Sequence, residues 1–79
     1  MQIRKGKHSM YIIMYIQGKE YNPMKKWNNF EELKQAVEMK LDVPDDNEIV
    51  VEAYIGDNLV NRGNTFKDTY ENIRLVCEI

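Results

Sequence analysis

The chain has 79 residues, of which 43% are hydrophobic and 30% charged, and its formal net charge is −2. This length forms one domain, and the composition is ordinary for a globular protein. The negative charge argues against a nucleic-acid-binding protein, which normally carries a strongly basic stripe. The longest apolar run, residues 10–16, is too short to span a membrane, and we see no secretory signal. The lone cysteine, Cys77, fits a reducing compartment. We therefore expect a soluble intracellular domain, cytoplasmic or nuclear.

Residues 1–9 differ in composition from the rest of the chain. They contain few apolar side chains and carry the basic residues Arg4, Lys5 and Lys7 together with His8. Such a segment cannot bury enough apolar surface to be ordered on its own, and chain ends are often disordered. We expect residues 1–9 to be a disordered basic tail, and residues 10–79 to form the folded domain.

The folded part is predicted to begin with a hairpin. Residues 10–17 are rich in β-branched and aromatic side chains, which predicts a strand. Gly18 and Lys19 then favour a tight turn into a second strand over residues 20–27. Pro23 lies within this second strand and has no N–H to donate, so the strand is expected at an edge of the sheet.

The clearest predicted helix spans residues 30–41. Asn29 can cap its first turn, and Glu32 three residues later completes a capping-box pattern. Pro44 ends the helix, because a residue before proline avoids helical dihedral angles. The apolar residues recur at helical spacing and line one side of the helix: Phe30, Leu33, Val37 and Leu41.

A strand is predicted over residues 49–55. Strict alternation of its side chains divides them between two faces of the sheet. One set contains Ile49, Val51, Ala53 and Ile55, and the other contains Val50, Glu52 and Tyr54.

The end of the chain is predicted to contain short elements. Residues 56–58 favour a turn into a brief strand around Leu59 and Val60, followed by a loop over residues 61–64. Thr65 starts a short helical turn over residues 65–70. Residues 72–79 alternate as a closing strand, with inward residues Ile73, Leu75, Cys77 and Ile79. No repeat is visible in the sequence.

These elements predict an α+β domain. One main helix would pack on one face of a mixed sheet of four to five strands, with the first and last strands parallel and adjacent. That arrangement is the β-grasp. Five side chains are expected in the core: Ile12, Leu33, Val37, Val51 and Leu75.

From Phe30 onward the sequence resembles the ubiquitin-like family. The resemblance is carried by "FEELKQAV", "DVP" and "GDNL…NTFKD", and the family pattern of the last stretch is matched by Gly56, Leu59, Thr65, Phe66 and Asp68. It implies a ubiquitin-like β-grasp fold. Members that are conjugated to other proteins end in paired glycines, and no such pair follows Ile73 in this chain. We therefore expect no conjugation.

The sequence offers little for catalysis. It holds a single histidine, a single serine and a single cysteine, and His8 and Ser9 lie in the predicted tail. A nucleophile needs a base within hydrogen-bonding reach on an ordered scaffold. We expect no enzyme activity and no cofactor. The acidic group of Asp42, Asp45, Asp46 and Glu48 lacks the glycine and regular spacing of a calcium loop, so no metal site is expected.

The sheet face opposite the helix is the predicted binding surface. Ubiquitin-like domains commonly recruit proteins through this face, so the resemblance implies a protein partner. The net charge and the short apolar run predict no nucleic acid and no membrane as partners. The residues expected to bind are Tyr11, Ile13, Tyr15, Val50, Glu52, Tyr54, Arg74 and Val76. Two other readings remain open: the face is a weak homodimer contact, or its tyrosines and valines reflect strand preference alone.

The leading hypothesis is thus a non-catalytic ubiquitin-like interaction module. One alternative is a modifier or carrier whose glycine tail is missing from this sequence. Another is a small viral or phage inhibitor on the same scaffold. Covalent adducts of the protein, as opposed to reversibly bound partners, would favour the modifier.

Overall fold

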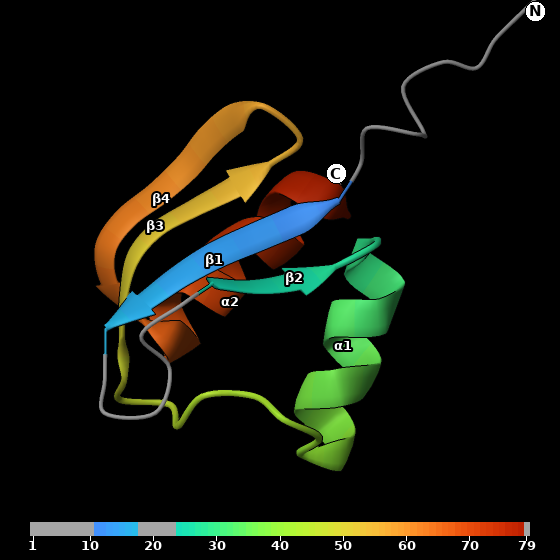
Figure 1. Cartoon of the computed structure of the whole chain (residues 1–79). Coiled ribbons are helices and arrows are strands. Elements are labelled where there is room, and N and C mark those ends of the chain that lie inside the picture. Colours follow the sequence, from blue (N-terminus) through green and yellow to red (C-terminus); the bar gives the residue numbers. More distant parts are fainter. Residues whose placement is uncertain (1–10, 18–23, 79) are drawn as a thin grey trace, which may run out of the picture.

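The computed structural model describes residues 11–17 and 24–78. The elements follow one another in the order ββαββα (Figure 1). They are β1 (Ile12–Gln17), β2 (Met24–Trp27), α1 (Phe30–Met39), β3 (Ile49–Ile55), β4 (Asn58–Thr65) and α2 (Phe66–Cys77). The predicted α+β class is confirmed. The predicted basic tail, the turn at Gly18 and Lys19, and Pro23 fall outside the described residues.

The described strands form one sheet in the order β2-β1-β3-β4, and each neighbouring pair is antiparallel. The prediction that the second strand lies at an edge is confirmed. The predicted mixed sheet is wrong, because the residues expected to form a parallel closing strand belong to α2 instead. β4 is also longer than expected, since the predicted loop over residues 61–64 continues the strand, with Gly63 at a φ of 68°.

The C-terminal segment forms a helix because a capping residue and side chains at helical spacing stabilise it, and these outweigh the alternation of apolar residues that predicted a strand. Thr65 caps the helix through its side chain, which accepts a hydrogen bond from the Asp68 N–H at 3.1 Å. Phe66, Thr69 and Ile73 are buried at spacings of three and four, while Leu75 is 55% exposed. The prediction that Leu75 lies in the core is therefore wrong.

The predicted helix at residues 30–41 is confirmed as α1, with a slightly earlier end. The Asn29 side chain accepts a hydrogen bond from the Glu32 N–H at 2.9 Å, which caps the first turn. Lys40 ends the helix in the left-handed conformation, with a φ of 54° and a ψ of 49°. This reversal turns Leu41 away from the apolar side of the helix and leaves it exposed.

A bulge in β3 decides which of its side chains are buried. On β1, Ile12, Met14 and Ile16 point to the helices and are buried. Tyr15 pairs with Glu52, but the next residue, Ile16, pairs with Val50, so Val51 is an extra residue. Val50 is consequently 0% exposed and Val51 42% exposed, which reverses the predicted orientations.

The core lies between the sheet and the two helices. It contains Ile12, Met14, Ile16, Leu33, Val50, Ala53, Ile55, Phe66 and Ile73. The predicted burial of Ile12 and Leu33 is confirmed, while Val37 is only partly buried at its margin. α2 runs behind the sheet in Figure 1, and α1 lies beside β2.

The chain folds as two consecutive ββα units, although the sequence shows no obvious repeat. Each unit gives the sheet one inner strand, β1 or β3, and one outer strand, β2 or β4. Each helix begins with phenylalanine, Phe30 or Phe66, directly after a capping residue, Asn29 or Thr65. The central pairing of β1 with β3 therefore joins the two units.

Candidate functional site

The sheet has one face covered by helices and one face that no described helix covers. Residues that pair directly across antiparallel strands share a face, so the register places each side chain. We call the uncovered side the open face. It includes Tyr11, Ile13, Tyr15, Gln17, Met24, Lys26, Ile49, Glu52, Tyr54, Leu59 and Arg62.

Aromatic and aliphatic side chains occupy the middle of the open face. Tyr15 from β1 and Tyr54 from β3 meet edge to face, with ring centroids 6.2 Å apart and planes at 76°. Ile13 is paired with Tyr54 across the same two strands. Tyr15 is 43% exposed, and Met24 and Leu59 on the outer strands are also exposed. The register places these side chains next to one another across the four strands, as an apolar cluster on the open face.

Charged groups on the open face contact one another and the tyrosines. The Glu52 carboxylate accepts a hydrogen bond from the Tyr54 hydroxyl at 2.8 Å and pairs with the Arg62 guanidinium at 3.3 Å. The hydrogen bond to this carboxylate raises the pKa of Tyr54 above its usual value. On the other side, the Lys26 ammonium lies 4.7 Å from the centroid of the Tyr11 ring. Tyr54 is thereby oriented by the hydrogen bond of its hydroxyl, and Tyr11 by the cation over its ring.

The structure brings together five of the predicted binding residues on the open face: Tyr11, Ile13, Tyr15, Glu52 and Tyr54. The placement of Val50 on this face is wrong, because the bulge at Val51 turns Val50 into the core. Arg74 and Val76 were expected there as residues of a closing strand. They belong instead to α2, which packs on the opposite face of the sheet.

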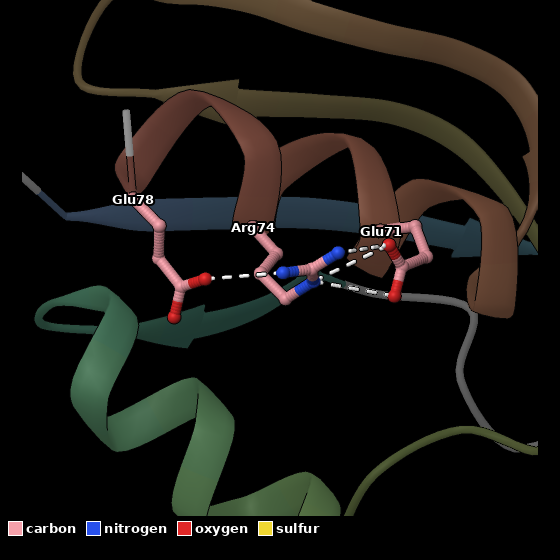
Figure 2. A network of polar contacts seen from close by, with 3 residues as sticks. All are labelled: Glu71, Arg74 and Glu78. Carbon is pink, nitrogen blue, oxygen red and sulfur yellow. Dashed lines mark hydrogen bonds and ion pairs between the residues drawn. The ribbon is translucent and has the colours of Figure 1, made fainter.

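Arg74 takes part in a helix-surface network instead. Its guanidinium pairs with Glu71 at 2.8 Å and with Glu78 at 3.1 Å, one carboxylate on each side along α2 (Figure 2). The hydrogen bonds hold the pKa of Glu71 below its usual value and raise the pKa of Arg74. Pairs at these spacings support an exposed helix. These two ion pairs explain the position of Arg74 on the surface of α2, and no role in partner binding is needed for it.

The residues of the open face that were missed from the sequence include Met24, Lys26, Leu59 and Arg62. All four lie on the outer strands, β2 and β4. Lys26 pairs with Ile13, and Arg62 pairs with Glu52. Alternation within residues 24–27 could have placed Met24 and Lys26 on one face. Arg62 had no such signal, because its strand was expected to end before it.

The described residues offer little chemistry elsewhere. Cys77 lies on α2, partly buried, and burial raises the pKa of its thiol, which disfavours the reactive thiolate. Within residues 11–17 and 24–78, no group of His, Cys, Asp or Glu side chains is placed to hold a metal ion. A cavity of about 420 Å³ beside α1 has walls that include Val37, Val43 and Phe66, with Asp46 and Glu48 also lining it. His8 and Ser9 lie outside the described residues.

Comparisons with known proteins found no match: no protein-family model, no curated protein sequence and no solved structure matches this chain. Neither described helix has the length and apolar character needed to cross a lipid bilayer. A proposal about function therefore has to be based on the properties of the open face.

Proposed function

We propose that this protein is a non-catalytic, intracellular interaction module that binds a protein partner reversibly through the open face. The observation that carries the proposal is the cluster of Tyr11, directly before β1, with Ile13, Tyr15 and Tyr54 on the two inner strands, on the side where no described helix lies. Tyrosine contributes a large contact area at a small cost in conformational entropy, and binding hot spots are rich in it. The oriented Glu52–Arg62 pair supplies polar specificity beside them.

A ubiquitin-like relationship remains part of the proposal. It is supported by a hairpin followed by a helix, and by Gly56 and Thr65, which fill the turn and capping roles of the family pattern. The antiparallel sheet and the position of α2 depart from the parallel first and last strands of the β-grasp. The proposed binding function does not depend on the relationship, because it is based on the composition of the open face.

The test is partner capture by a variant with Tyr15→Ser and Tyr54→Ser together. Neither side chain belongs to the core, so we expect the fold to persist and capture from the native host to be lost. Gln35→Ser is the matched control, because Gln35 is exposed on α1, away from the open face. Mass spectrometry of the captured material distinguishes bound proteins from covalent adducts. Unchanged capture by the double variant would rule out the open face as the binding surface.

A further inference from the structure

We propose that this chain exchanges its second ββα unit with another copy of itself, which gives a dimer with two complete sheets. In the exchanged dimer, β3, β4 and α2 of one molecule pack on β1, β2 and α1 of the other. The exchange goes beyond the proposed function and does not depend on what the open face binds. It follows from the way the two units meet and from the short, strained hinge between them.

The contacts between the two units do not require both units to belong to one molecule. β1 pairs with β3 along the seam, from Ile12 opposite Ile55 to Gln17 opposite Ile49. The two helices complete the core on one side of the sheet, and they too belong to different units. The covalent link between the units is the connection over residues 40–48 (Figure 1). A second molecule offers the same strand and the same core surface, so exchange recreates these contacts.

Each end of the connection is anchored to its own unit. At the start, the Leu41 N–H donates to the Ala36 carbonyl of α1 at 2.9 Å. At the end, the Lys67 N–H of α2 donates to the Asp46 carbonyl at 3.1 Å. Both hydrogen bonds lie within a unit and persist in either arrangement, so the change of direction is confined to a hinge at residues 42–45. Short hinges under strain invite exchange between molecules.

The hinge begins with a strained residue. Asp42 has a φ of 56°, a left-handed conformation that residues other than glycine adopt at a cost. An extended Asp42 removes this cost and redirects the chain that follows. The next residue, Val43, precedes Pro44 and therefore already favours extended dihedral angles. The Asp42 carboxylate pairs with Lys25 of β2 at 2.8 Å, but its side chain is 78% exposed, and exposed ion pairs stabilise a conformation weakly.

Two effects oppose exchange in the folded monomer. Pro44 is buried, so opening the hinge removes it from its packing. The intact connection also holds the two units together without the entropic cost of association. We therefore expect exchange when chains fold together at high protein concentration. The dimer should then separate slowly, because its seams must open first.

Exchange would make each open face a product of two molecules. Tyr15 would come from one molecule, and Glu52 and Tyr54 would come from the other. Two such faces in one assembly bind a ligand with two copies of the binding element more tightly than a single face does. This bivalence, unlike the exchange itself, rests on the proposed function.

A disulfide across the seam distinguishes exchange from other kinds of dimer. Tyr15 pairs with Glu52 across β1 and β3, neither belongs to the core, and paired residues of adjacent strands are close enough for a disulfide. One full chain carries Tyr15→Cys and another carries Glu52→Cys, both with Cys77→Ser. The two are unfolded in urea, refolded together at high concentration and oxidised. We expect a covalent heterodimer, joined between positions 15 and 52 by mass spectrometry.

Two controls accompany the disulfide experiment. A single chain with both Tyr15→Cys and Glu52→Cys should close its own disulfide in dilute solution, which shows that the two positions are in reach. Gln35→Cys, at an exposed position on α1, replaces Glu52→Cys as the matched control. Its heterodimer yield should be at least about tenfold lower, because no strand pairing brings the two thiols together. Equal yields, or no heterodimer while the single chain closes, would overturn the inference.

Hinge variants test the cause of the exchange, with light scattering after size-exclusion chromatography as the measurement. Asp42→Gly removes the cost of the left-handed conformation, so dimerisation should weaken at least about fivefold. Asp57→Gly is the matched control, since Asp57 is an exposed turn residue outside the connection, and dimerisation should not change. Deletion of Val43 and Pro44 shortens the hinge and should make the folded protein dimeric.

The hinge variants also state what contradicts exchange. Equal effects of Asp42→Gly and Asp57→Gly would remove strain as its cause. A deletion variant that is folded by circular dichroism and still monomeric would show that the hinge does not control association. If the deletion variant does not fold, the disulfide yield and Asp42→Gly decide. None of these results bears on partner capture through the open face, so the proposed function stands or fails by its own test.

Discussion

The bulge in β3 makes two neighbouring valines respond differently to the same substitution. Val50 is 0% exposed and Val51 is 42% exposed, although both are valines in the same strand. Val50→Ala removes the equivalent of two buried methylene groups, which costs about 1.6 kcal/mol of transfer free energy. The residual cavity adds to this, so we expect a total loss of about 2–3 kcal/mol. Val51→Ala should change the free energy of unfolding by no more than about 0.5 kcal/mol, because the side chain is half exposed.

Urea unfolding followed by the fluorescence of Trp27, the single tryptophan, measures both variants. A small domain has an m value near 1 kcal/mol/M in urea, so the midpoint of Val50→Ala should fall by about 2–3 M. The midpoint of Val51→Ala should stay within about 0.5 M of the parent. Without the bulge the two valines would exchange faces. A larger loss for Val51→Ala, or equal losses, would therefore refute the assigned register.

Three further predictions concern the core, a helix end and an ionisable group. Leu33→Ala should cost about 2–5 kcal/mol in urea unfolding, because Leu33 is the one fully buried residue of α1, and a shift near zero would contradict its position. Lys40→Gly should raise the unfolding free energy by up to about 1 kcal/mol, since glycine removes the strain at a φ of 54°, and a loss of stability would argue against that conformation. Tyr54 should ionise above the usual tyrosine pKa, by NMR titration of labelled tyrosines, and Glu52→Gln should lower its midpoint. The hydrogen bond from Tyr54 to Glu52 stabilises the fold at pH values below the raised pKa, and this stabilisation is lost as the pH rises through that pKa. An unchanged titration midpoint of Tyr54 in Glu52→Gln would exclude the hydrogen bond.

The elements with one dominant sequence pattern were predicted well. Asn29, Leu33 and Val37 fit only a helix, and Ile12, Met14 and Ile16 alternate as a strand with one buried face. The α2 segment was ambiguous, because Ile73, Leu75 and Cys77 alternate while Phe66, Thr69 and Ile73 recur at helical spacing. The spacing of Glu71, Arg74 and Glu78 was the available sign of a helix, since it permits ion pairs on one helical face.

The binding face was predicted only in part for a different physical reason. Alternation assigns faces correctly along a regular strand, so Tyr11, Ile13 and Tyr15 were placed together. A bulge adds one residue and reverses the alternation on one side of it, and both valines at the bulge are equally suited to the core. Sequence alone could not say whether Val50 or Val51 is buried. The outer-strand residues depend on pairing between segments that are distant in the chain.

The two ββα units are covalently joined by residues 40–48 alone, and otherwise meet along the β1–β3 seam and in the shared core. A chain cleaved within that connection keeps each hairpin together with its helix. The severed halves would still present complementary apolar surfaces, with Ile12 and Met14 on one side and Val50 and Ala53 on the other. Reassembly must then overcome the entropy of bringing two molecules together, a cost that the intact connection removes. The inner strands β1 and β3 are thus the elements through which the two halves would have to recognise each other.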